Sequence, residues 1–339
     1  MNRSQVLVGL LLALPGAVGA QTPPPTVHEL RASPTTIHRW FFDASLPPVL
    51  SVNSGDFVRL WTATGNPRYF EAMGMPREQI PPELYGVFQG VEGQGREDHT
   101  LNGPIAVRDA LPGDVLEVRI LSVDVWLPLA GIGFAGGGVL ADQFPYVVDR
   151  PLRFTEDKRA IVFAPGIEIP TRPFWGIIGV APPIVWGRVP SPAPGLFGGN
   201  MDNPDLGAGS IVYLPVHVPG ALLSVGDGHA AQGYGEVAGG AAEASLEGEI
   251  QIILHKDRHI HWPRAETPTH YMTMGFHADL DEAARIATSE MVAFLVAEKH
   301  LTHDDAYLIC SLAMNLVVTQ VVDGTKGIHA MIPKEIFTR

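Results

Sequence analysis

The stretch Asp114-Val-Leu-Glu-Val-Arg-Ile-Leu-Ser-Val-Asp-Val125 alternates apolar and polar residues and follows a Pro112-Gly113 turn. Because successive side chains of a strand point to opposite faces, this alternation predicts a strand with one buried face. Similar patterns predict further strands at 49–60 (around a turn at 53–56), 159–164, 209–215 and 247–255. Long stretches rich in glycine and proline, notably 126–145 and 164–208, are predicted loops. We therefore predict a mostly β fold with a β-sandwich or barrel-like core.

The C-terminal part has helical periodicity instead. Asp279 with Glu282 forms a capping box before residues 283–300, and Thr302 with Asp305 begins a second predicted helix. That second helix is predicted to end near Asp323, and it is apolar on nearly every side, which is typical of a buried helix. We expect one domain over residues 28–339, β-rich to about residue 278 and ending in a helical pair at 279–323.

The first twenty residues have the features of a secretion signal. Arg3 precedes an apolar stretch at 6–14, and Val18-Gly19-Ala20 supplies small residues for cleavage. Residues 21–27 are predicted to be an exposed linker. No later stretch is apolar over enough residues for a membrane-spanning helix. We expect a protein that is periplasmic or secreted, without a membrane partner.

Composition narrows the classes of function. The formal net charge of −13 and the lack of a basic run argue against a nucleic-acid partner. The single cysteine, Cys310, cannot form an internal disulfide and is predicted to be a small core residue. With 339 residues, 46% of them apolar, the chain can bury a large core. Apolar segments such as 126–141 are compatible with a subunit interface or a pocket wall, and we expect a homo-oligomer.

Residues 224–236, Ser-Val-Gly-Asp-Gly-His-Ala-Ala-Gln-Gly-Tyr-Gly-Glu, carry the strongest functional signal. Their glycines permit close backbone approach, and polar side chains stand between them. In an extended segment Asp227 and His229 face the same side, where an unpaired aspartate would be costly. Two interpretations stay open at this point: a metal site with carboxylate and imidazole ligands, or an Asx-turn beside a buried histidine.

Other motifs are weaker. Gly131-Ile-Gly-Phe-Ala-Gly136 matches the dinucleotide-binding string, but no helix is predicted after it. His255, His259 and His261 could chelate a metal, although histidines at a charged strand exit are more often solvated. Ser224 lies near His229, yet the chain has no G-x-S-x-G motif, so a serine hydrolase is disfavoured.

The chain resembles the acetamidase/formamidase family over most of residues 28–339. The matching blocks are 99–107 (HTLNGPIAV), 111–118, 176–182, 198–202 (GGNMD), 214–216, 220–236 and 318–324 (VTQVVDG). The resemblance implies a mostly β fold and hydrolysis of a small carboxamide to a carboxylate and ammonia. It also implies a divalent metal, with zinc as the first candidate, and some relatives open lactams.

This resemblance and the residues together predict a site. The predicted metal ligands are Asp227, His229 and His99. The predicted catalytic residues are Glu236 or Glu243 as general base and Gln232 as a donor to the developing oxyanion. The predicted substrate-binding residues are Phe174, Trp175, Asn200 and Tyr234.

The chain departs from the family pattern at three places. Tyr234 and Asn315 stand where the family usually has aspartate, and Phe174-Trp175 precedes Gly176 where smaller residues are usual. The two aromatic residues suggest a bulkier, flatter substrate than acetamide. The departures also leave two alternatives to a carboxamide hydrolase: a periplasmic binding protein without turnover, or a hydrolase of lactams or other cyclic amides.

Overall fold

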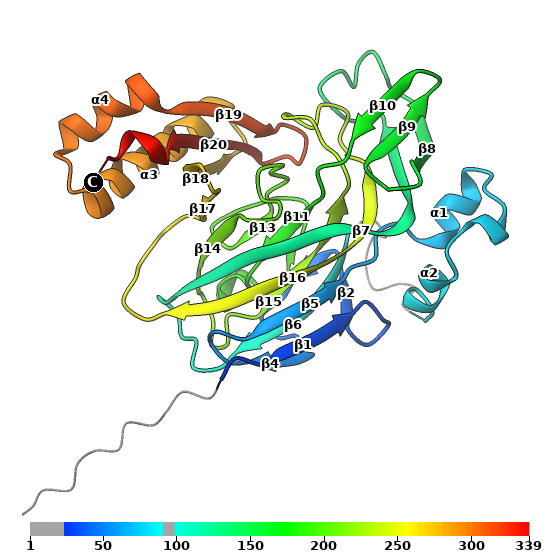
Figure 1. The fold of residues 1–339 in the computed structure, drawn as a ribbon, viewed down its shortest axis with the longest axis horizontal. Coiled ribbons are helices and arrows are strands. Elements are labelled where there is room, and N and C mark those ends of the chain that lie inside the picture. The colour runs from blue at the N-terminus through cyan, green and yellow to red at the C-terminus, as the bar shows by residue number, and fades with distance from the viewer. Residues whose placement is uncertain (1–23, 91–98, 339) are drawn as a thin grey trace, which may run out of the picture.

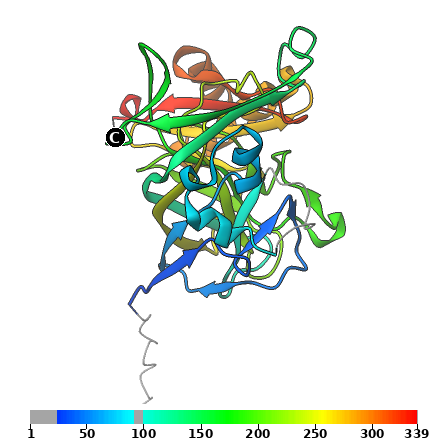
Figure 2. The same cartoon turned by 90° about the vertical axis from the view of Figure 1, so that its right-hand side faces the viewer.

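The computed structural model describes residues 24–90 and 99–338 and has the predicted mostly β fold (Figure 1). Its C-terminal elements, orange to red, gather at the opposite end of the molecule from the blue N-terminal strands (Figure 2). The strands are β1 (Val27–Arg31), β2 (Ile37–Arg39), β3 (Phe41–Phe42), β4 (Leu50–Val52), β5 (Phe57–Trp61), β6 (Thr100–Val107), β7 (Val115–Ala135), β8 (Val147–Phe154), β9 (Ala160–Ala164), β10 (Ile167–Pro170), β11 (Phe174–Gly179), β12 (Val189–Pro190), β13 (Gly198–Asn200), β14 (Ile211–Pro215), β15 (Leu223–His229), β16 (Glu243–His255), β17 (Arg264–Glu266), β18 (His270–His277), β19 (Asn315–Gln320) and β20 (Lys326–Pro333).

Two runs of paired strands make up the main body. The first runs in the order β1-β5-β16-β7-β14-β17-β18-β20-β19. In the second, β15 pairs with β6 and with β11, and β2, β4 and β13 extend it. The two runs join where His229 of β15 pairs with Glu243 of β16. The site described below lies at this junction.

The main hydrophobic core is built from the inward faces of these strands. Leu60, Leu101, Leu116, Ile120 and Trp175 are among its fully buried side chains. Complete burial of one such aliphatic side chain stabilises the fold by about 1.5–3 kcal/mol. The alternation holds over residues 118–121, where Val118 and Ile120 are buried and the residues between and after them are exposed. A register shift opposite Ile250 then moves the buried positions to Val123 and Val125, and Glu117 is buried as well.

The predicted strands are present, with three corrections. The predicted loop at 164–208 contains β10, β11, β12 and β13. Residues 49–60 form β4 and β5 around the predicted turn, but β4 pairs in parallel with β6 and not with β5. Residues 126–135, predicted as loop, continue β7, which is 21 residues long and pairs with β8 and β16. The glycine string at 131–136 therefore lies mostly in a strand. This geometry agrees with the rejection of dinucleotide binding.

The helices are α1 (Pro67–Ala72), α2 (Pro82–Val87), α3 (Leu280–Lys299) and α4 (His303–Ala313), with short 3₁₀ turns at Arg77–Gln79, Ile184–Trp186 and Lys334–Ile336. The predicted caps are confirmed: the side chain of Asp279 accepts from Glu282 N–H, and that of Thr302 accepts from Asp305 N–H. α3 packs on β18 and β20. A Cβ on Gly275 of β18 would stand 2.1 Å from Ala283 O, so glycine is required for this close approach.

The second predicted helix is wrong in length and in burial. α4 ends at Ala313, and residues 315–320, which contain Val317, Val318 and Thr319, form β19 against β20. A β-branched run favours a strand, and an apolar stretch alone does not distinguish the two structures. Leu308 and Leu312 are 62% and 85% exposed, whereas Cys310 is buried as predicted.

The N-terminal predictions are tested only in part. Residues 1–20 and the start of the linker lie outside the described residues. The linker is shorter than predicted, since Thr26 N–H donates to Asp56 Oδ1 at 2.8 Å and β1 begins at Val27. Of the helices among the described residues, none combines the length and hydropathy of a membrane span.

Candidate metal and catalytic site

His229, the last residue of β15, stands at the centre of a buried polar cluster. Its Nε2 lies 3.3 Å from Asp227 Oδ2 and 3.3 Å from Glu243 Oε2. Asp227 and His229 share a face of the strand, as predicted, and the β15–β16 pairing brings Glu243 opposite. These three residues form a group whose ligand atoms could hold one metal ion.

Gln232 fixes the orientation of the His229 ring. His229 Nδ1 lies 2.8 Å from Gln232 Oε1, and Gln232 Nε2 donates to the carbonyl of Asp202 at 2.8 Å. Because an amide oxygen only accepts, Nδ1 carries the proton and Nε2 faces the two carboxylates. Burial alone would lower the pKa of His229, but Glu243 and Asp227 raise it well above its usual value. The two carboxylates therefore favour a positive charge at Nε2, supplied by a proton or by a metal ion.

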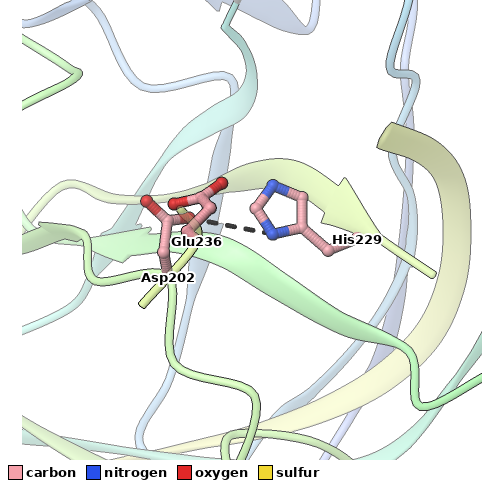
Figure 3. A group of neighbouring side chains, drawn as sticks. All are labelled: Asp202, His229 and Glu236. Carbon is pink, nitrogen blue, oxygen red and sulfur yellow. Dashed lines mark ion pairs between the residues drawn. The ribbon is translucent and has the colours of Figure 1, made fainter. Parts of the chain in front are cut away.

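A second group shares the same ring. Asp202 and Glu236 point toward His229 (Figure 3), and Asp202 Oδ1 is 3.8 Å from His229 Nδ1. Burial and Glu236 raise the pKa of Asp202 well above its usual value, and burial raises the pKa of nearby Asp323 to about 6. Asp202 Oδ1, Glu236 Oε2 and Asp323 Oδ2 are buried and have no hydrogen-bond partner among the described residues.

The backbone of the cluster is strained. Asp202, Asp227 and Glu236 have φ angles of 45°, 54° and 47°, in the left-handed region that non-glycine residues rarely adopt. Such residues cost about 1–3 kcal/mol each and gather at functional sites. Gly176 makes room between them: its Cβ would stand 2.4 Å from Asp202 Oδ1 and 2.8 Å from Asp227 Oδ2. Three acidic residues with strained backbone around one imidazole ring indicate a site that binds a ligand, because this arrangement does not stabilise the fold.

Two of the predicted roles need correction. Gln232 is engaged by His229 and by the Asp202 carbonyl, so it orients the histidine and is not available as the predicted oxyanion donor. His99 belongs to neither ligand group among the described residues; its Nδ1 lies 2.9 Å from Ser191 Oγ. It is near enough that its charge is the second-largest influence lowering the pKa of Asp227, after that of His229, and it also opposes the rise in the pKa of Asp323.

The predicted substrate-binding residues separate into three environments. Trp175 is fully buried in the main core, where its indole N–H donates to Thr62 Oγ1 at 3.1 Å, so it does not reach the cluster. Phe174 is also buried and packs edge-on against the His229 ring. Asn200 donates to the Asp202 carboxylate. Of the two aromatic residues behind the expectation of a bulky, flat substrate, only Phe174 therefore lies at the cluster.

Tyr234 points away from the cluster. Its hydroxyl donates to Asp205 Oδ2 at 2.7 Å. Partial burial and the neighbouring Asp205 raise the pKa of Tyr234 to about 12, so the hydroxyl stays protonated as a donor. The histidines at 255, 259 and 261 do not converge either: His255 Nε2 contacts Glu117 Oε2 at 2.6 Å, and His259 Nδ1 contacts Gly113 O.

Two members of the cluster, Asp202 and Asp323, were not predicted as site residues. Asp202 lies in the GGNMDN segment, which is equally typical of turns, and Asp323 was taken as a helix end. Both nevertheless fall in blocks that carry the family resemblance. Their position inside these blocks is the feature of the sequence that could have identified both aspartates as site residues.

Fold and site together define a β-rich protein with a buried centre of carboxylates around one histidine. A family model for the "Acetamidase/Formamidase family" matches residues 92–185 and 191–339. The acetamidase structure from Bacillus halodurans is 30% identical, with a TM-score of 0.77, over 91% of this chain and 98% of that one. The acetamidase structure from Yersinia enterocolitica is also 30% identical, with a TM-score of 0.78, over 95% and 96%. The chain therefore belongs to the acetamidase/formamidase family.

Curated relatives match over shorter segments. The formamidase of Methylophilus methylotrophus is 31% identical over 252 residues, which are 55% of this chain and 61% of that protein. The chain spans about half the length of the curated relatives it matches, between 47% and 61%.

Proposed function

We propose that this protein is a metal-dependent hydrolase that converts small carboxamides to a carboxylate and ammonia. The observation that carries the proposal is the group of carboxylates around His229. Among the described residues, the ion pairs of Asp202, Asp227 and Glu243 in this cluster are with His229. Family membership supports the class of bond, because the relatives above are named acetamidase and formamidase.

The donor set fits a divalent cation. One imidazole nitrogen with carboxylate oxygens is a donor set that zinc accepts, and zinc is the metal we propose. Asp227, His229 Nε2 and Glu243 would hold it, because these atoms already converge. When bound, the metal would polarise the amide carbonyl and lower the pKa of a bound water to roughly 7.

We assign the general base to Glu236. Glu243 shares His229 Nε2 with Asp227, which suits a ligand, whereas Glu236 belongs to the second group, with Asp202. Glu236 Oε2 has no hydrogen-bond partner in the described part of the chain. Burial raises the pKa of Glu236 well above its usual value, which suits a carboxylate that takes a proton from water near neutral pH. The same oxygen would then pass that proton to the leaving nitrogen, which must be protonated to depart as ammonia.

Export and assembly are further parts of the proposal. The leader pattern of residues 1–20 supports a periplasmic or secreted protein. Exposed apolar side chains on β8, β9 and β10, among them Val147, Val162 and Ile167, support a homo-oligomer. N-terminal sequencing of the exported protein and light scattering of the purified one test these two points.

Ammonia release by the mature protein tests the reaction. The panel runs from formamide to aromatic amides, after chelation and after zinc is returned, and lactams are followed by product analysis because ring opening frees no ammonia. We expect zinc-dependent ammonia release from the smallest amides. A folded, zinc-loaded protein that is silent on open-chain amides contradicts the proposal, and lactam turnover or binding without turnover would replace it.

A further inference from the structure

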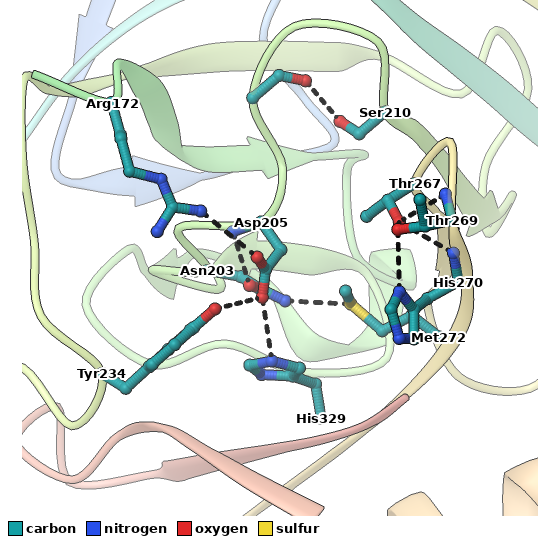
Figure 4. Close-up of polar contacts among 11 residues, drawn as sticks. Arg172, Asn203, Asp205, Ser210, Tyr234, Thr267, Thr269, His270, Met272 and His329 are labelled. Atoms are coloured by element: carbon teal, nitrogen blue, oxygen red, sulfur yellow. Dashed lines mark hydrogen bonds and ion pairs between the residues drawn. The ribbon is translucent and has the colours of Figure 1, made fainter. Parts of the chain in front are cut away.

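A second network of polar side chains lies beside the cluster and centres on Asp205 (Figure 4). Tyr234 O–H donates to Asp205 Oδ2 at 2.7 Å, and His329 Nε2 lies 3.3 Å from the same oxygen. Arg172 Nη2 lies 3.5 Å from Asp205 Oδ1. His329 is fully buried, and its Nδ1 lies 2.7 Å from Thr319 Oγ1. The carboxylate of Asp205 is thus contacted from three different segments of the chain.

Two members of this network lie within three residues of a cluster residue, and a third contacts a strand that leads to one. Asp205 is three residues after Asp202, and Tyr234 is two residues before Glu236. His329 contacts Thr319, on the strand that leads to Asp323. Backbone bonds join two of these segments directly, since Gly235 N–H donates to Thr319 O at 2.9 Å and Val321 N–H donates to Gly235 O at 3.2 Å.

The segments that carry Asp202, Glu236 and Asp323 need contacts that hold them together. Asp202, Glu236 and Asp323 are buried together and repel one another when ionised. Glu236 is also held in a left-handed conformation. Repulsion and strain both favour movement of residues 233–236 away from the cluster, so an opposing contact must hold them in place.

We propose that Tyr234 is a positioning residue, which through Asp205 and His329 holds residues 233–236 so that Glu236 stays beside Asp202 and His229. An aspartate in place of Tyr234 would set a second carboxylate against Asp205. The tyrosine hydroxyl supplies a donor instead. This inference rests on the proposed function only for its effect on turnover.

The test compares Tyr234→Phe with Tyr307→Phe, a matched control on the exposed face of α4. Tyr234→Phe keeps the ring and removes the hydroxyl, so we expect kcat to fall by about 10- to 100-fold while KM stays within about twofold. Hydrogen exchange of the amides in 233–236 and 319–323 should become about tenfold faster or more, with exchange in α3 unchanged. The control should match the wild type in every measurement.

A double-mutant cycle with Asp205→Asn sharpens the result. If both residues act through one contact, the double variant should lose little more activity than either single variant. Unchanged exchange in 233–236 overturns the inference, and so does a raised KM with unchanged kcat, which would place Tyr234 against the substrate. Because exchange needs no turnover, a wild-type protein without amidase activity refutes the proposed function and still leaves this inference tested.

Discussion

Two histidine–carboxylate clusters lie at opposite ends of the β7–β16 pairing, and they differ in how their charges are balanced. At one end of the β7–β16 pairing, Glu117 is almost fully buried, with His255 Nε2 2.6 Å from its Oε2 and Arg119 bonded to its Oε1. At the other end, Glu243 meets His229 within a group of buried acids. The first cluster pairs one carboxylate with two basic side chains.

The second cluster places several carboxylates around one histidine. Its oxygens on Asp202, Glu236 and Asp323 have no hydrogen-bond partner within residues 24–90 and 99–338, and two of these residues are in strained backbone. A buried carboxylate is therefore not in itself the mark of a functional site. A functional site is indicated instead by buried charges that no opposite charge balances, on a strained backbone, because such an arrangement does not stabilise the fold.

The comparison predicts its largest effect for the two histidines. His229→Ala should reduce amide turnover to background and abolish zinc retention, because it removes the imidazole that both ligand groups of the described residues share. His255→Ala removes an imidazole from the balanced cluster and should leave turnover within about twofold. The measurements are ammonia release and zinc content after gel filtration, with circular dichroism to confirm folding.

Two results would contradict the difference that we infer between the clusters. Near-full activity of His229→Ala in chelated buffer would mean that the ligand assignment is wrong. A loss of zinc from His255→Ala would move the metal to the 255–261 segment, where the histidines do not converge.

Local patterns predicted most of the fold. Alternation predicted the first part of β7, a short apolar run predicted β14, and the capping boxes predicted the starts of α3 and α4, because these signals depend only on neighbouring residues. The end of α4 was missed because residues 314–320 are apolar without alternation. The parallel pairing of β4 with β6 was missed because pairing between distant strands leaves no local pattern.

The site was predicted to a similar extent and for the same reason. Asp227 and His229 are two residues apart, so their shared face follows from strand geometry. Asp202 and Asp323 are distant in sequence, and only the folded chain brings them to the His229 ring. Trp175 was misplaced because a strand residue next to a site residue points to the opposite face.

A smaller effect is expected on stability in the metal-free protein. Burial raises the pKa of Asp323 to about 6 from 3.8, so the folded state keeps a proton that the unfolded state has released. Stability should therefore fall as pH rises from about 3.8 to about 6, by about 3 kcal/mol in total for this group. The asparagine of Asp323→Asn cannot ionise, so this loss of stability should be absent from the variant. The free energy of unfolding of the variant should therefore rise relative to that of the wild type between pH 4 and pH 7.

Urea unfolding of chelated protein across that pH range measures this difference. The zinc-loaded wild type is the control, because a cation beside the cluster favours the ionised carboxylates and should flatten or reverse the slope. Parallel curves for chelated wild type and Asp323→Asn would show that Asp323 is not buried with the other acids.

The smallest effect is expected at the balanced cluster. Glu117→Gln keeps the size of the side chain and an oxygen for Arg119, but it removes the charge that faces His255. We expect a loss of about 1–2 kcal/mol in the free energy of unfolding, typical of a hydrogen bond to a charged group. Turnover and zinc content should not change, since the centre around His229 does not depend on this pair. If Glu117→Gln lowers turnover without lowering stability, charge at one end of the β7–β16 pairing influences the other, and the two clusters are a single electrostatic unit.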